Sequence, residues 1–473
     1  LVYHNLDLGG GPNFRWQYRC FPMYEIVSLL TVFNPHLSAT VIRQFSQVVF
    51  AVLAMTGRVS MLHISRWTLQ GGSYRTIQRF FNTVLPWGTL CWVFFRTHLL
   101  DDESVYILAG DETIVSKSGE STYGLSHFFS ALYGKCVPGL AFFAVSLVSV
   151  KARRSYPMLM EQIVRCQAAS GSGTLAAETQ NNTEASLEKQ KRGRPKGSRN
   201  QNKTDVVLSD TLKHLQTMLM TVLAEVGDRI PLRYLVLDGY FGHNNALQMA
   251  KRCGLHLISK LRVNTALYFP ATQPYAGRGR PRIYGERFNP RRVPAKWRIS
   301  VETIGNMTVE VYQLKLRHKK FADPLNVVCV LKTHRIRQEK SHVLLFSSDL
   351  SLAAETMIDY YSLRFQLEFN FRDAKQYWGL EDFMNVNKIP VNNAANLSMF
   401  MVNVSAKLLA PLRLEYAEVG ILDLKAHYRG LKYLRETLKI LPQKPDAIVI
   451  DEIAEHLGSI GAIHQIPAQL NTS

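Results

Sequence analysis

The stretch YYSLRFQLEFNFRDAK, residues 360–375, decides how the rest of the chain is interpreted, because it has the pattern of an amphipathic helix. At about 100° per residue, the spacing i, i+3, i+7 and i+14 keeps four polar side chains within about 60° of one another. These four are Tyr361, Arg364, Glu368 and Lys375. The opposite side is apolar: Leu363, Leu367 and Ala374. The alternative interpretation is a solvated helix face on which Arg364 and Glu368 form an ordinary i, i+4 ion pair.

Two aspartates elsewhere in the chain suggest a partner set for Glu368. Asp111 follows the apolar segment SVYILA (104–109), and Asp238 follows LRYLVL (232–237). Both segments have strand patterns, and side chains at strand ends of α/β sheets are displayed on rigid supports. Two aspartates and a glutamate are the hard oxygen ligands that Mg²⁺ or Mn²⁺ prefers. Two such ions, about 4 Å apart, would activate the attacking and leaving oxygens of a phosphodiester. Taken singly, each aspartate could instead be a turn residue that ends its strand.

The composition describes a folded globular protein with a polyanionic partner. Of 473 residues, 47% are apolar and 20% are charged, and the formal net charge is +19. No uninterrupted apolar run approaches the about 18 residues of a membrane span, and the first residues lack the pattern of a secretory signal. The six cysteines contain no C-x-x-C pair, which favours reduced thiols in a cytoplasm. We therefore expect cytoplasmic localisation and a nucleic-acid partner, and no membrane partner.

Most of the chain alternates between helical and strand patterns. Helices are expected within 24–100, including 60–69 and 73–85 around Gly71-Gly72, which resemble a helix-turn-helix; the alternative is a plain helical hairpin. Residues 125–136 and 139–150 have the pattern of a hairpin that turns at Pro138-Gly139. Further elements are expected at 211–226, 232–237, 245–253 and 255–261, then strands at 298–304, 309–316, 326–331 and 341–346, and helices at 353–376, 394–409, 423–440 and 451–457. This order predicts an α/β protein.

Together these motifs resemble the DDE transposases of bacterial insertion sequences, in the group with the Tyr-Arg-Glu-Lys signature. The matching motifs are GDET with Asp111, LDGYF with Asp238, and Y-x2-R-x3-E-x6-K over residues 361–375. The resemblance covers roughly residues 100–380. It implies that Asp111, Asp238 and Glu368 hold two Mg²⁺ or Mn²⁺ ions and catalyse the reaction. It also implies that Tyr361, Arg364 and Lys375 grip the DNA.

The resemblance further implies an RNase H-like core that is interrupted by a β-rich insertion. The expected organisation is a helical N-terminal DNA-binding domain (1–100), a first core part (101–262) with a basic linker (167–205), the insertion (263–340), a second core part with the Glu368 helix (341–390) and a helical C-terminal region (391–473). The C-terminal helices are candidates for the contact of a homodimer on DNA.

Two basic segments concentrate the excess charge. Residues 186–203 carry seven Lys/Arg and one Glu, and residues 278–298 carry eight Lys/Arg and one Glu, so together they supply +13 of the +19. Each contains Arg-Gly-Arg-Pro, with Arg192 and Arg194 in the first and Arg278 and Arg280 in the second. This motif resembles the AT-hook, which binds the narrow minor groove of A·T-rich DNA. The alternative for both segments is a solvated basic linker.

A tryptophan in the expected insertion is a further candidate for DNA contact. Trp297 lies between Lys296 and Arg298, and in related enzymes an aromatic side chain of the insertion stacks on a flipped base. The alternative is a Trp that is buried at a sheet edge.

The sequence therefore predicts a cut-and-paste DNA transposase that cleaves transposon ends and joins them to target DNA. Two alternatives stay open: an RNase H-like endonuclease without strand transfer, and a domesticated, non-enzymatic DNA-binding protein.

Overall fold

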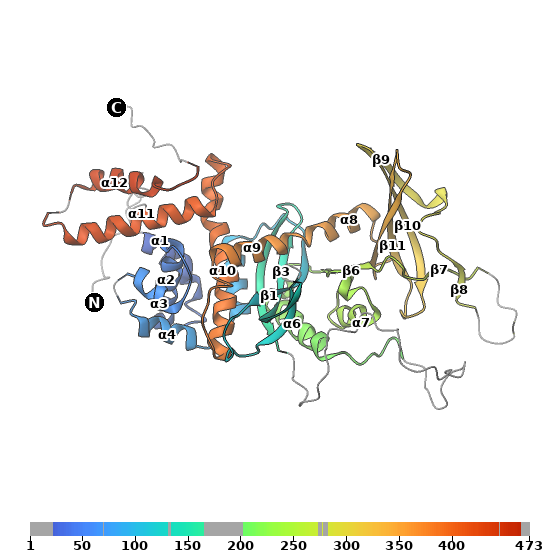
Figure 1. Cartoon of the computed structure of the whole chain (residues 1–473), viewed down its shortest axis with the longest axis horizontal. Helices are drawn as coiled ribbons and strands as arrows, with labels where there is room; N and C mark the ends of the chain where they lie inside the picture. The colour runs from blue at the N-terminus through green and yellow to red at the C-terminus, as the bar shows by residue number, and fades with distance from the viewer. Residues whose placement is uncertain are drawn as a thin grey trace.

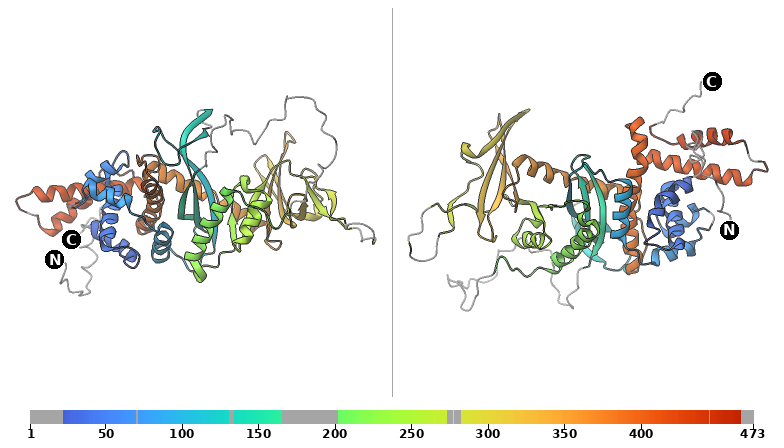
Figure 2. Two further views of the ribbon diagram at one scale, coloured as in Figure 1. Left: turned by 90° about the horizontal axis from the view of Figure 1, so that it is seen from below. Right: turned by 180° about the vertical axis from the view of Figure 1, so that it is seen from behind.

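The computed structural model describes residues 22–69, 71–130, 134–164, 202–272, 277, 282–443 and 445–464. The molecule is elongated, with the N-terminal helices and the α11–α12 pair at one end and strands β7–β12 at the other (Figure 1, Figure 2). The described strands join into one twelve-stranded sheet of order β2-β3-β1-β5-β6-β12-β11-β10-β7-β8, with β4 paired to β3 and β9 paired to β10. The chain thus has a mixed α/β architecture.

The N-terminal part is helical. Its helices are α1 (Pro22–Leu30), α2 (Ala39–Ala54), α3 (Met61–Trp67), α4 (Tyr74–Asn82) and α5 (Trp87–His98). As the sequence predicts, a glycine turn joins α3 to α4, and the Ser73 hydroxyl caps α4 by accepting from the Thr76 N–H. Gly72 is required here, because a Cβ at this position would lie 2.2 Å from the Thr68 Cβ. The outer face of α4 is exposed: Tyr74, Arg75, Gln78 and Arg79.

The first half of the sheet contains β1 (Tyr106–Ser116), β2 (Ser126–Ser130), β3 (Lys135–Ser149) and β4 (Arg154–Ile163). The predicted turn at Pro138-Gly139 is wrong, because both residues lie inside β3 and are paired with His127 and Ser126 of β2. Gly139 is needed for close strand approach, since a Cβ would lie 2.8 Å from the Val115 carbonyl oxygen. The sequence pattern does not predict strand β4, whose Pro157 is accommodated at a register shift between Val145 and Ser146 of β3.

The centre of the sheet is parallel and continues into the β-rich strands without a break. Strand β1 pairs with β5 (Tyr234–Val236), and β5 pairs with β6 (His256–Leu261), both in parallel. Strand β12 (Lys340–Ser347) then pairs antiparallel with β6. The outer strands are β7 (Leu267–Pro270), β8 (Tyr284–Arg287), β9 (Arg298–Ile304), β10 (Met307–His318) and β11 (Leu325–His334). Strands β9–β12 are thus found where the sequence predicts them, and they extend the core sheet.

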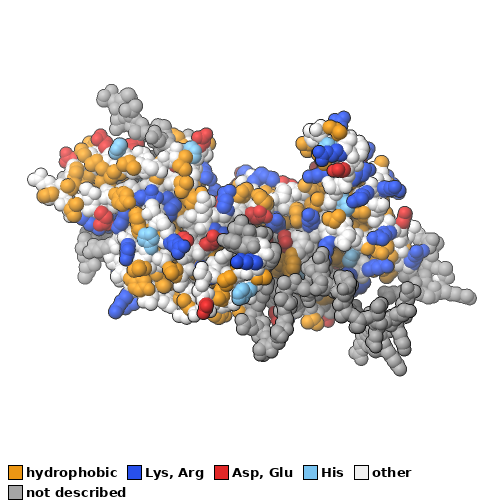
Figure 3. Space-filling model, viewed as in Figure 1, with side chains coloured by type: hydrophobic (Ala, Val, Ile, Leu, Met, Phe, Trp, Pro, Cys, Tyr) orange, Lys and Arg blue, Asp and Glu red, His pale blue; other side chains and the backbone are white. Residues whose placement is uncertain are grey.

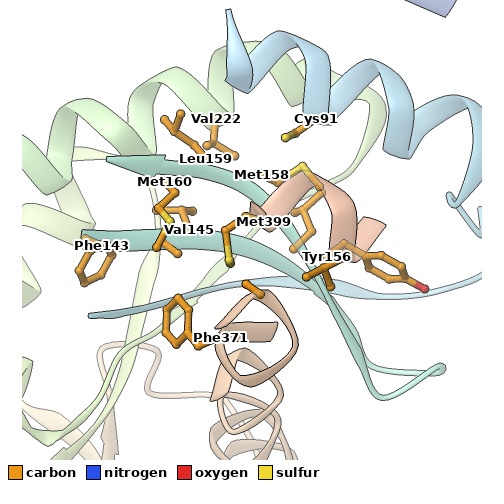
Figure 4. Packing of buried hydrophobic residues seen from close by; sticks show 14 of the residues in the cluster. Cys91, Phe143, Val145, Tyr156, Met158, Leu159, Met160, Val222, Phe371 and Met399 are labelled. Carbon is orange, nitrogen blue, oxygen red and sulfur yellow. The ribbon is translucent and has the colours of Figure 1, made fainter. Parts of the chain in front are cut away.

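Helices cover both faces of this sheet. One face packs on α6 (Asp210–Val226), α7 (Asn244–Arg252), α5 and α10, and the other packs on α8 (Ala354–Leu363) and the start of α9 (Gln366–Tyr377). The alternation along β1 explains the division, since Tyr106 and Leu108 belong to the first core and Ile107 and Ala109 to the second. Figure 4 shows the first core, in which Met158 of β4 and Val145 of β3 lie among side chains of α5, α6, α9 and α10.

The C-terminal part consists of α10 (Lys388–Glu415), α11 (Ile421–Ile440) and α12 (Ala447–Ser459). By length and composition α10 is apolar enough to cross a membrane, but 67% of its apolar window is buried inside the protein. Its buried asparagines bind neighbouring elements: Asn393 donates to the Phe81 and Thr83 carbonyls, Asn396 to the Met160 carbonyl and Asn403 to the Pro157 carbonyl. These contacts are those of a core helix that joins the N-terminal helices to the sheet.

Candidate active site

The sequence predicts Asp111 at the end of a strand, but the residue lies inside β1. The prediction holds only for the pairing with β5, which ends before Asp111, and not for the pairing with β3. Along β3 the pairing of β1 continues to Ser116, with Asp111 opposite Ala144. Along β5 the pairing ends at Ala109–Val236, two residues before Asp111. A glycine is needed at position 110 for β1 to pack closely against Phe143 of β3, because a Cβ there would lie 2.7 Å from the Phe143 ring. The Asp111 side chain thus lies where β1 and β5 separate.

Asp238 follows the end of β5. It lies two residues beyond Val236, just as Asp111 lies two residues beyond Ala109, the partner of Val236 in the last pair of β1 and β5. It forms the N-cap of the 3₁₀ turn Gly239–Phe241, and its backbone carbonyl accepts the Ser259 hydroxyl at 2.6 Å. The following loop packs closely on β6, since a Cβ at Gly242 would lie 2.2 Å from the Lys260 carbonyl oxygen. Asp238 is therefore fixed to the sheet edge by backbone contacts, as the sequence predicts for a strand-end aspartate.

Glu368 lies in the first turn of α9, on a helix that the sequence predicts as continuous over 353–376. The structure instead has two helices, α8 and α9, with Arg364 and Phe365 between them. Here the hydrogen bonds tighten to i, i+3, from the Arg364 N–H to Tyr361 and from the Phe365 N–H to Ser362. The predicted apolar side is confirmed, because Leu363, Leu367 and Ala374 are fully buried.

Arg364 brings two of the carboxylates into one ion network. Its Nη1 donates to the Asp111 Oδ2 at 2.5 Å, and its Nη2 donates to the Glu368 Oε1 at 3.1 Å. The predicted i, i+4 pair therefore exists, and it extends to a residue 253 positions away. Only 16% of the Arg364 side chain and 19% of the Asp111 side chain are exposed. The contact is thus largely shielded from water and is worth more than a surface ion pair.

The third carboxylate is close enough to act electrostatically on this network. Burial raises the pKa of the Asp111 carboxyl; the Arg364 guanidinium opposes this rise, and the negative charges of Asp238 and Glu368 add to it. Burial likewise raises the pKa of Tyr361, whose hydroxyl contacts Arg364 and feels the charges of Asp238 and Asp111. Asp111, Asp238 and the segment from Tyr361 to Glu368 thus come from three parts of the chain that are distant in sequence and act on one another electrostatically.

Lys375 takes part in a neighbouring contact and not in the ion network. Its ammonium donates to the Ile114 carbonyl of β1 at 2.8 Å and pairs with Glu381 at 3.2 Å. This side chain therefore ties α9 to β1 beside the carboxylates.

The three carboxylates fit divalent cations in their chemistry, because hard oxygen donors are what Mg²⁺ and Mn²⁺ prefer. Among the residues that the structure describes, no group of three or more His, Cys, Asp and Glu side chains is close enough to hold a metal ion. The positive charge between Asp111 and Glu368 is that of Arg364, whose buried Nε has no hydrogen-bond partner. A bound ion would therefore have to take over contacts that this guanidinium makes.

The remaining predicted site residues lie apart or outside the described residues. Arg192, Arg194, Arg278 and Arg280 fall outside them. Trp297 ends the 3₁₀ turn Ala295–Trp297 before β9, with the Lys296 ammonium 5.5 Å from its ring centroid. The alternative of a buried Trp is wrong, because 37% of Trp297 is exposed. Trp297 lies before β9 among the β-rich strands, whereas the carboxylates lie on β1, just after β5 and on α9.

Sequence reasoning missed two features near the site. One is an exposed aromatic pair at the start of α9, Phe365 just before the helix and Phe369 in it, with ring centroids 5.3 Å apart and Arg372 over the second ring. The other is a basic cavity that adjoins Asp238, to which the run Arg-His-Lys-Lys at 317–320 contributes. That run is visible in the sequence, but its distance from Asp238 along the chain hides the connection.

Comparison with known protein families gives a match. The family described as DDE superfamily endonuclease matches residues 32–320, which is more than half of the 473 residues and includes Asp111 and Asp238. No curated protein matches the chain. The mixed α/β sheet agrees with this match. The chain therefore belongs to the DDE superfamily endonucleases.

Proposed function

We propose that the protein is a cut-and-paste DNA transposase of the Tyr-Arg-Glu-Lys group found in bacterial insertion sequences. The family supports a transposase or nuclease acting on DNA. The observation that carries the finer proposal is the single network around Arg364, which joins Asp111 and Glu368 and lies within the field of Asp238 and Tyr361. Arg364 of the signature thus contacts both Asp111 and Glu368, and Tyr361 interacts electrostatically with the same group.

Asp111, Asp238 and Glu368 would hold two Mg²⁺ or Mn²⁺ ions, in keeping with the divalent metals that DDE nucleases typically use. When bound, the ions activate the attacking oxygen and stabilise the leaving oxygen of a phosphodiester. The chain's own residues position these groups: β1 and β5 fix the aspartates, and Lys375 holds α9 against β1. Arg364, released from the carboxylates, and Tyr361 would contact the phosphates at the cleavage point.

The substrate would be the two transposon ends and then the target DNA. A net charge of +19 favours such a polyanion. The two Arg-Gly-Arg-Pro segments would add minor-groove contacts, and α4 would add contacts from its exposed cations. Because two ends must be held together, we propose a homodimer on DNA in the bacterial cytoplasm, associated with the nucleoid.

The test begins with cleavage of a labelled duplex that carries the ends of the element, in the presence of Mg²⁺. Short inverted repeats flanking the coding region would supply these ends. Asp111→Asn, Asp238→Asn and Glu368→Gln should each reduce cleavage by about a thousandfold, because each removes several kcal/mol of metal-dependent stabilisation. Glu355→Gln is the matched control, since Glu355 is an exposed residue of α8 outside the network. It should retain cleavage.

Strand transfer is tested with pre-cleaved ends and a target plasmid. Joined products support transposition. Cleavage without joining would leave an RNase H-like endonuclease, for which the family description as an endonuclease is the favouring observation. If Glu368→Gln changed no DNA-processing activity, the enzymatic proposal would fail and a domesticated, non-enzymatic DNA-binding protein would remain.

A further inference from the structure

A cavity of about 1730 Å³ lies beside the candidate active site. Its walls come from residues 202–204 and Val206, the start of α7 with the loop after Asp238, the β6–β7 connection, β8 and the β10–β11 turn. It begins at Gly239 and Tyr240, directly after Asp238, and lies at the edge where β5 and β6 end. The volume exceeds the about 300–1,000 Å³ of ordinary small-molecule pockets, so the cavity suits a segment of a polymer.

The walls of the cavity are strongly cationic. Among the described residues that line it, six are Lys or Arg and none is Asp or Glu: Lys203, Arg262, Arg282, Arg317, Lys319 and Lys320. Within the described ranges, none of the six has a carboxylate partner at 4.0 Å or less, whereas Lys251 and Arg252 at the far end of α7 pair with Asp323 and Asp205. Unneutralised cations in a concave site concentrate positive potential and favour phosphates.

One buried side chain connects two walls of the cavity to α7. Asn244, the first residue of α7, donates to the Lys203 carbonyl at 2.8 Å and accepts from the Ala322 N–H at 3.1 Å. It therefore ties two walls to the helix. Burial lowers the pKa of His318, and Lys320 and Lys203 lower it further, which agrees with a positive field inside.

Aromatic rings stand among these cations. Tyr240 is 73% exposed at the start of the cavity, so its ring is accessible to a ligand there. Deeper in, Tyr268 and Tyr284 have ring centroids 5.6 Å apart, and the Lys319 ammonium lies 5.0 Å from the Tyr268 centroid. Exposed rings beside cations form the combination that binds unpaired nucleotides, because base faces are accessible only outside a duplex.

We propose that this cavity binds an unpaired stretch of DNA, with its phosphates on the Lys and Arg side chains and a base stacked on Tyr240. The proposal rests on the DNA substrate of the proposed function. Because the cavity continues from Asp238 along the same sheet edge, a strand held in it would lead directly to the carboxylates. Figure 3 shows Lys and Arg side chains gathered over the end of the molecule formed by the β-rich strands.

The test uses the full chain and fluorescence anisotropy with a fluorescein-labelled oligothymidine and, separately, a blunt duplex. Tyr240→Ala should weaken oligothymidine binding about tenfold and leave the duplex unchanged, because it removes one stacking partner. Tyr240→Phe keeps the ring and should bind as the wild type does. Arg317→Glu with Lys320→Glu should flatten the log–log salt dependence for the oligothymidine by about 1.4, at about 0.7 per phosphate contact.

The matched control is Arg335→Glu with Arg337→Glu. Both residues are exposed in the β11–β12 turn, outside the cavity. Their substitution changes the charge of the β-rich strands by the same amount as Arg317→Glu with Lys320→Glu. Equal weakening of oligothymidine binding in this control would overturn the proposal, as would equal weakening of the duplex by Tyr240→Ala or no weakening at all.

The same measurements separate this inference from the proposed function. Glu368→Gln should keep its affinity for oligothymidine, because Glu368 does not line the cavity. If the wild type neither cleaves nor joins DNA but Tyr240→Ala selectively weakens binding of the single strand, the proposed function fails and the cavity assignment stands. If cleavage and joining occur but the cavity variants bind normally, only the cavity assignment fails.

Discussion

Replacing Arg364 by Gln should destabilise the protein without metal and increase its affinity for divalent ions. Arg364 is the cation between Asp111 and Glu368, with contacts of 2.5 and 3.1 Å. Removing it leaves carboxylates that repel one another and that Asp238 repels further. The same change removes the positive charge with which a metal ion would compete.

The magnitude follows from the exposure of each contact. A hydrogen bond to a charged group contributes about 1.5–3 kcal/mol. The Asp111 contact keeps most of this because it is well shielded, whereas the Glu368 side chain is 43% exposed and its contact is worth under about 1 kcal/mol. We expect the free energy of unfolding to fall by about 2–3 kcal/mol. If a bound ion replaces the guanidinium, about 2 kcal/mol of this returns as affinity, or about 30-fold tighter Mg²⁺ binding.

The assay is urea unfolding with and without Mg²⁺, combined with calorimetric titration of Mg²⁺ or Mn²⁺. Arg364→Lys should fall between the wild type and Arg364→Gln, because an ammonium keeps the charge but cannot span both carboxylates. Arg229→Gln is the control: it breaks the exposed pair with Asp102, at 2.7 Å, and should cost under about 1 kcal/mol with no effect on metal affinity. Equal metal affinity in the wild type and Arg364→Gln would refute the competition between guanidinium and ion.

Three further predictions concern stability and DNA binding. Burial lowers the pKa of Lys425 to about 7, against about 10.4 in the unfolded chain. Between these pH values the folded state binds fewer protons than the unfolded state, so the free energy of unfolding should rise with pH by up to about 1.4 kcal/mol per pH unit. Lys425→Met should remove this slope, as measured by urea unfolding between about pH 7 and 8.5. Gly72→Ala should cost about 1–3 kcal/mol through its clash with Thr68, whereas Gly88→Ala, whose nearest neighbour would be 3.6 Å away, should be neutral or stabilising in thermal unfolding. Deleting residues 186–203 should flatten the log–log salt dependence of duplex binding by about 0.9 for each phosphate that the segment neutralises, and an unchanged slope would show that this segment does not bind DNA.

The parts of the fold that local patterns determine were predictable from the sequence. Helix α6 and strand β9 lie within one residue of the predicted bounds. An apolar periodicity was enough to predict α6, and an alternating pattern was enough to predict β9. The turn assigned to Pro138-Gly139 failed because the glycine serves close strand approach and not a turn. Strand β4 escaped prediction because Pro157 argues against a strand unless the partner strand shifts register, which only tertiary pairing reveals.

The candidate site was predictable in its residue types but not in its contacts. Helical spacing places Arg364 beside Glu368, and that pair is present. The contact of Arg364 with Asp111 depends on how α8 and α9 pack over β1, which no local pattern encodes. The interruption between α8 and α9 contains no Pro or Gly, so the sequence carried no signal for it.

The antiparallel pairing of β12 with β6 sets the distance between the β-rich strands and the carboxylates, and so the place along a bound DNA that the carboxylates would reach. Four consecutive residue pairs, from Leu344–Leu261 to Ser347–Ile258, join the β-rich strands to the strand beside Asp238. The backbone hydrogen bonds of such a ladder hold the two strands side by side, within the twist of the sheet. The separation between the β-rich end and the carboxylates is therefore built into the sheet as a fixed length. A DNA end gripped by those strands would therefore meet the carboxylates at a set distance from the point at which it is held.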